Sequence, residues 1–119
     1  MNLGRVSSAA LMASGLAGVV MPRRVSAALE LPAQSARGTA ETRAGLGGTY
    51  AALGGWALVS RNPTSRAAVG VVWLGAATAR LASLRLDHPK TDAAFWAYLA
   101  AEVSLGAAAV LSSGTPARR

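Results

Sequence analysis

The stretch from Ala93 to Ser112 reads AAFWAYLAAEVSLGAAAVLS and carries one charged residue, Glu102, in twenty positions. An apolar helix of about 20 residues spans the hydrocarbon core of a bilayer. Glu102 is the tenth residue of the stretch, so at a rise of about 1.5 Å per residue it would lie about 15 Å from the end, near the bilayer midplane. A charge at that depth costs about 2.5–3.5 kcal/mol, and we therefore expect Glu102 to face other helices and to have a partner.

The preceding stretch, Ala67 to Leu86, is also apolar and is interrupted only by Arg80 and Arg85. A short break separates the two stretches, so we expect them to form antiparallel neighbouring helices. Arg80 would then lie about 9 Å from their shared end, and its long side chain can reach Glu102. Trp73, seven residues before Arg80, lies on the same helix face.

Two further uncharged runs of 17 residues lie nearer the N-terminus, one between Arg5 and Arg23 and one between Arg43 and Arg61. Each has about the minimum length that crosses a bilayer. The sequence therefore predicts an all-α, polytopic membrane protein: a bundle of four transmembrane helices in a single domain of residues 1–119. The expected spans are about 6–22, 44–60, 67–86 and 93–112, with 113–119 as a flexible tail.

The connections between the spans contain helix-breaking and helix-capping residues. Residues 22–31, PRRVSAALEL, start with a proline suited to the first helical position and predict a short helix lying in the membrane interface. Residues 32–42 predict a polar loop. Thr91 or Asp92 is expected to cap the last helix, and Thr64 or Ser65 the third.

The composition excludes several kinds of site. With no cysteine and one histidine, the chain offers no disulfide, thiolate or imidazole cage, and we predict neither a metal nor a cofactor. Only 14% of the residues are charged, well below the quarter or so typical of soluble domains. The net charge of +7 comes mainly from arginines at the ends of the apolar runs. This pattern is typical of juxtamembrane segments and, without interleaved aromatic residues, argues against nucleic-acid binding.

The sequence allows one alternative to the membrane bundle as a whole and one to its first span. A soluble alanine-rich bundle would need a polar stripe on every helix, which the first two runs lack. A signal peptide would use Arg5 as its basic region and Val25-Ser26-Ala27 as its cleavage site, but Arg23 and Arg24 would then lie between the apolar run and the cut.

An even number of spans puts both termini on one side of the membrane. Basic residues number five on that side and six on the other, so charge does not decide the orientation. We favour the cytoplasmic side for the termini, because the flanking segments there are short and purely basic.

Small residues recur every four positions in the first two spans, and such rows let helix backbones approach closely. We expect them to pack within the chain rather than to form a homodimer face. The rows are Gly47, Ala51 and Gly55, then Gly48 and Ala52, and in the first span Ala10, Ser14 and Gly18.

Several polar residues are expected near one side of the bilayer, where the second span begins and the last two spans meet. Tyr50 lies on the same helix face as Arg43. One interpretation is a structural network of ion pairs; the other is a site for a small molecule or a lipid head group. The candidate ligand-binding residues are Glu41, Arg43, Tyr50, Trp73, Arg80 and Glu102.

The leading functional hypothesis is a non-enzymatic binding module or accessory subunit with a polar pocket on one side of the bundle. Alternatives are a membrane enzyme acting on a lipid or quinone-like molecule with Glu102 as acid or base, a proton-linked transporter, and a purely structural subunit. The expected partners are membrane lipid, a lipid-like small molecule, and a second copy of the chain or another subunit of a membrane complex.

Short motifs of the sequence also resemble a known family. They are Met21-Pro22, Glu41-Thr42-Arg43, Gly47-Gly48, Ala79-Arg80-Leu81 and Ala101-Glu102. The chain resembles small bacterial four-helix membrane proteins classified as a domain of unknown function, which are similar in outline to DoxX-like membrane proteins. The resemblance implies the four-helix fold and the bacterial plasma (inner) membrane as location, and it implies no activity.

Overall fold

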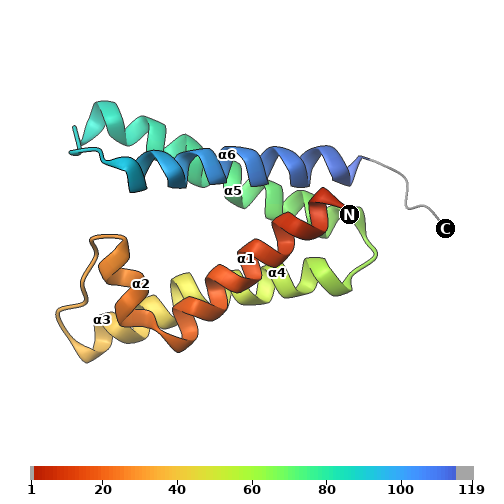
Figure 1. Ribbon diagram of the computed structural model, residues 1–119. Helices are drawn as coiled ribbons and strands as arrows, with labels where there is room; N and C mark the ends of the chain where they lie inside the picture. Colours follow the sequence, from red (N-terminus) through yellow and green to blue (C-terminus); the bar gives the residue numbers. More distant parts are fainter. Residues whose placement is uncertain (1, 115–119) are drawn as a thin grey trace. The chain divides into compact units, whose positions relative to one another are not determined.

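The computed structural model describes residues 2–114, which form helices and connecting turns without a β-strand. The predicted all-α class is thereby confirmed. The helices follow one another in the order drawn in Figure 1. They are α1 (Leu3–Val20), α2 (Pro22–Ala28), α3 (Ala36–Glu41), the π-helix η1 (Thr42–Gly48), α4 (Thr49–Val59), α5 (Pro63–Leu86) and α6 (Ala93–Ser113).

Three of these helices, α1, α5 and α6, are long and apolar enough to cross a membrane. They overlap three of the four predicted spans. The remaining predicted span, 44–60, is divided between η1 and α4, and α4 has only 11 residues. The predicted flexible tail begins inside α6, at Ser113, and its residues 115–119 lie outside the described part of the chain.

Capping side chains fix where the last two helices begin. Asp92 accepts a hydrogen bond from the Phe95 N–H at 2.9 Å, as predicted for the start of α6. The expected cap of α5 was wrong: Asn62 is the capping residue, and its Oδ1 accepts from the Thr64 N–H at 2.9 Å. Pro63 follows at the first helical position, where its missing N–H costs nothing.

The segment expected to be a polar loop is partly helical. Ser35 caps α3 by accepting a hydrogen bond from the Gly38 N–H at 3.0 Å. Arg37 and Glu41, one turn apart, form an exposed ion pair at 3.1 Å. A cap and an i, i+4 pair together stabilise this short helix, which continues directly into η1.

The described residues divide into two compact units, with the boundary inside α1. We call residues 8–60 the N-terminal unit, and residues 2–7 with 61–114 the hairpin unit. In the N-terminal unit, α1 crosses η1 and α4 through glycines. A Cβ atom on Gly18 would lie 2.8 Å from the Gly47 Cα, and one on Gly54 would lie 2.5 Å from the Met12 backbone nitrogen.

The predicted use of small residues for packing within the chain is therefore seen for part of the predicted rows, since Gly18 packs against Gly47. Gly15 and Gly18 make the close approach, whereas Ser14 is exposed and returns its hydroxyl to the Ala10 carbonyl at 2.8 Å. In α4, a Cβ atom on Gly55 would lie 3.8 Å from its nearest neighbour, whereas one on Gly54 would lie 2.5 Å from its nearest neighbour. The spacing of small residues predicted the kind of contact, and the crossing geometry selected the face.

In the hairpin unit, α5 and α6 lie side by side and antiparallel (Figure 1). They cross at glycines: a Cβ atom on Gly70 would lie 3.0 Å from the Gly106 carbonyl oxygen, and one on Gly106 would lie 2.7 Å from Leu74 Cγ. The first turn of α1 joins this unit, where Ser7 Oγ donates to the Leu105 carbonyl at 2.7 Å. Small residues at these points allow backbones to touch.

Large apolar side chains lie mostly on the outside. The largest fully buried side chains are Leu11 and Val69, followed by the serines Ser7, Ser8, Ser26 and Ser65. Exposed large apolar side chains are what a lipid-facing helix presents. The exposed large apolar residues are Leu3, Val6, Leu16, Val20, Met21, Leu31, Trp56, Val59, Val71, Leu81, Leu86, Trp96, Val103, Val110 and Leu111.

Candidate functional site: a charged pair between two apolar helices

Arg80 of α5 and Glu102 of α6 form the ion pair that the sequence predicted. The Arg80 Nη2 lies 2.6 Å from Glu102 Oε1, and Nε lies 2.9 Å from Oε2. This bidentate geometry matches the planar fork of a guanidinium to a carboxylate. Only 8% of the Glu102 side chain is exposed, against 24% of the Arg80 side chain. The Glu102 side chain is thus almost fully buried, whereas the Arg80 side chain is partly exposed.

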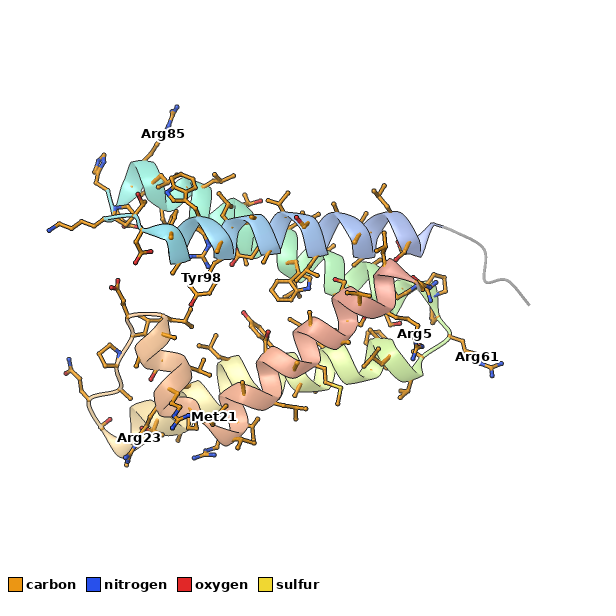
Figure 2. The ribbon with its side chains drawn as sticks, viewed as in Figure 1. Arg5, Met21, Arg23, Arg61, Arg85 and Tyr98 are labelled. Carbon is orange, nitrogen blue, oxygen red and sulfur yellow. The ribbon has the colours of Figure 1, made fainter. Side chains whose placement is uncertain are left out.

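Two aromatic rings of α6 flank the Arg80 guanidinium. Its Cζ atom lies 5.3 Å from the centre of the Phe95 ring and 5.6 Å from the centre of the Tyr98 ring. Such contacts add cation–π attraction, which is stronger where water is excluded. Figure 2 shows Tyr98 projecting from the side of α6.

Neither ring was among the predicted site residues, although their spacing from Glu102 indicates that they share its helix face. Tyr98 lies four residues and Phe95 seven residues before Glu102. These spacings place all three side chains on one face of a helix. A search of the Glu102 face for partners of Arg80 would have found them.

The register of the hairpin explains why the two charges meet. The close approach of Gly70 to Gly106 fixes which turns of α5 and α6 are opposite. Counted from this contact, Arg80 lies ten residues nearer the connecting turn and Glu102 only four residues nearer. The long Arg80 side chain covers this difference of about 9 Å along the helix axes. Because the two helices are joined by only the short segment after Leu86, the pairing follows from local chain geometry.

Trp73 makes a different contact, two turns before Arg80 on α5. Its indole Nε1 donates to the Ser7 carbonyl, with the two atoms 3.5 Å apart. This bond holds the first turn of α1 against α5. A role of Trp73 in lining a ligand site stays a prediction.

The other three candidate residues lie in the N-terminal unit. Glu41 pairs with Arg37 rather than with Arg43, because residues 36–41 are helical. Arg43 donates from Nη1 to the Val19 carbonyl. Tyr50, in α4, is half-buried. Their participation in a shared site with Arg80 stays a prediction.

Potential metal ligands do not gather in the described part of the chain. No group of three or more His, Cys, Asp or Glu side chains within residues 2–114 could hold an ion. The polar chemistry of the Arg80 site is therefore that of a guanidinium, a carboxylate and two aromatic rings.

The fold and this site define an all-α protein in which two helices able to cross a membrane are joined by a buried ion pair. The chain belongs to the family described as Domain of unknown function (DUF4345), whose sequence profile matches residues 3–112. The resemblance to a domain of unknown function is thus confirmed. No curated protein and no solved structure matches the chain.

Proposed function

We propose that the protein is a multi-pass protein of the bacterial plasma membrane with four spans, the second formed by residues 44–60. These residues carry no charge. Helix is continuous from α3 to α4, because Thr42 and Gly48 at the junctions have helical backbone angles. The Thr49 N–H bonds to the Ala44 carbonyl, so the wide π turn keeps its backbone hydrogen-bonded, as a bilayer requires.

The function we propose is the binding of a lipid-like small molecule at the Arg80–Glu102 pair. One observation carries this proposal: about a quarter of the Arg80 side chain stays exposed on a helix that can span a membrane. A guanidinium has five N–H donors, and the bidentate bond to Glu102 uses two of them. In hydrocarbon the remaining donors gain from any acceptor that reaches them.

The pair itself suggests the chemistry of this ligand. Arg80 and Glu102 together carry no net charge, so a neutral acceptor such as a carbonyl or ester oxygen fits better than a second anion. The flanking rings of Phe95 and Tyr98 offer apolar surface beside that acceptor. We therefore propose an amphiphilic molecule with a carbonyl-bearing head group.

The geometry of the pair also bears on two other functions, acid–base catalysis by Glu102 and a purely structural role. Both Glu102 oxygens accept from Arg80, so proton transfer by Glu102 would first require the pair to open, which favours binding over acid–base catalysis. A purely structural role, fixing the register of α5 against α6, is supported by the burial of Glu102 at 6% exposure. The ligand experiment below separates that role from binding.

The test is mass spectrometry of small molecules extracted from protein purified in detergent. We expect the wild-type chain to retain a carbonyl-bearing amphiphile. The double variant Arg80→Met with Glu102→Leu is expected to retain the fold but lose the molecule, because it removes the donors and leaves no unpaired charge.

Arg85→Met is the matched control, since Arg85 is an exposed arginine on the same helix (Figure 2). It should retain the molecule as the wild type does. Recovery of the same molecules in equal amounts from the wild type and the double variant would overturn the binding proposal and leave the structural role.

A further inference from the structure

A second polar feature of the hairpin unit lies where α1 and α5 begin. We call it the basic end and define it by Arg5, Arg61 and Arg66. Figure 2 shows Arg5 and Arg61 at the same end of this unit. The first turns of α1 and α5 contain no acidic residue.

Acidic residues of the hairpin unit are found elsewhere. Within its described residues they are Asp87 and Asp92, at the turn between α5 and α6, and Glu102 within α6. Since α5 is 24 residues long, Asp87 lies about 30 Å along the helix from the basic end. Among the described residues of this unit, charge is therefore segregated, with an excess of positive charge at the basic end.

Arg66 is held in a defined place at this end. Its Cδ atom would lie 3.0 Å from a Cβ atom on Gly4, so its stem packs against the first turn of α1. Its Nε atom is buried and has no hydrogen-bond partner among the described residues. A buried donor without an acceptor is costly, so a movement of the Arg66 side chain that brought Nε to an acceptor on a ligand would recover that cost.

The location indicates what kind of ligand can reach these groups. Arg61 is exposed just before α5, and Arg66 lies within its first turns. If α5 crosses a bilayer, its first turn lies at the depth of the lipid phosphates. Arginine binds phosphate through two parallel N–H bonds, and the start of a helix adds positive potential.

We propose that the basic end binds the phosphodiester group of an anionic phospholipid, with Arg61 and Arg66 as its main contacts. Arg5 adds positive charge from α1. The site lies at the opposite end of α5 from Arg80, so it neither requires nor affects the binding proposed there. It would fix the hairpin unit to the leaflet richer in anionic lipid.

The experiment is a lipid titration followed by native mass spectrometry of the full chain in a neutral detergent. The ligands are phosphatidylglycerol, phosphatidylcholine and inorganic phosphate. We expect the wild type to bind phosphatidylglycerol more tightly than phosphatidylcholine, with no competition from inorganic phosphate. Arg61→Gln and Arg66→Gln are each expected to weaken binding of phosphatidylglycerol about fivefold, since one juxtamembrane arginine contributes about 1 kcal/mol.

Arg85→Gln removes the same charge at the other end of α5 and should leave the affinity unchanged. Arg66→Lys keeps the charge without the fork and should lose less than Arg66→Gln. If the Arg66→Gln variant does not fold, the Arg61→Gln variant tests the proposal by itself, because Arg61 is exposed. Equal losses in Arg85→Gln and Arg61→Gln would overturn the proposal, because binding would then depend on net charge alone. Competition by inorganic phosphate would show an anion site without lipid selectivity and would also overturn it.

Discussion

At the scale of single residues, the burial of the Glu102 charge depends on Arg80 more than the position of the Arg80 charge depends on Glu102. Glu102 is almost fully buried, and both its oxygens accept from one guanidinium. Arg80 is more exposed and also contacts two rings. Removing one member of such a pair leaves an unpaired charge, which costs more than the pair contributes when intact.

A double-mutant cycle tests this dependence. Arg80→Met is expected to lower the free energy of unfolding by about 3 kcal/mol, because it leaves the buried Glu102 carboxylate without its counter-charge. The double variant Arg80→Met with Glu102→Leu should regain most of that loss. Unfolding in mixed detergent micelles, followed by circular dichroism, measures both. A double variant no more stable than Arg80→Met would contradict the account.

Glu30 is a second residue whose backbone carries a prediction. It follows α2 with a φ of 56°, a left-handed conformation that favours glycine. Its N–H bonds to the Ala27 carbonyl at 3.0 Å, and that of Leu31 bonds to the Ser26 carbonyl at 2.7 Å, which is the Schellman pattern of helix ends. Glu30→Gly should therefore raise the free energy of unfolding by about 1 kcal/mol. A decrease in thermal midpoint would show that the Glu30 side chain has a stabilising role of its own.

At the scale of elements, glycines determine how closely helices pack. In the N-terminal unit, η1 contains three glycines in seven residues, a composition that weakens the α-helical preference of the segment. Gly47 brings η1 within contact of Gly18 and Val19. The π-helical turn therefore lies where α1 and η1 cross.

Adjacent glycines in α4 provide a matched test of this packing. A Cβ atom on Gly54 would lie 2.5 Å from the Met12 nitrogen and 2.7 Å from the Ser8 carbonyl oxygen, both backbone atoms. Gly54→Ala should cost about 2 kcal/mol, because α1 would have to move away. On Gly55 the nearest atom is Met12 Sδ at 3.8 Å, so Gly55→Ala should be neutral or stabilising. Similar thermal midpoints for the two variants would contradict the close crossing.

At the scale of the whole molecule, the number of spans is tested by labelling. The chain has no cysteine, so single cysteines at Gln34 and Arg61 can be labelled without background, and both positions are exposed. With four spans, an impermeant thiol reagent added to intact cells should label only one of the two. With three spans, formed by α1, α5 and α6, both positions lie on the same side and should behave alike. Extraction of the chain from membranes by alkaline carbonate would contradict either topology.

The sequence by itself determined three helices that can cross a membrane, α1, α5 and α6, since span-forming ability is a sum of side-chain solvation energies along a segment. It also determined the Arg80–Glu102 pair, because a short turn fixes the relative depth of two residues on neighbouring helices. The start of α3 depended on signals that the sequence contained but that were not used, the Ser35 cap and the Arg37–Glu41 pair.

Only the tertiary structure decided which faces meet. Small residues line more than one face of the first two apolar segments, so the choice of Gly15 and Gly54 over Ser14 and Gly55 depends on the crossing geometry. The bond from Trp73 to Ser7 also depends on how each helix is rotated about its axis. The spacing of residues in one helix determines which of them share a face. Which face of the neighbouring helix packs against it depends on the packing energy of both helices together.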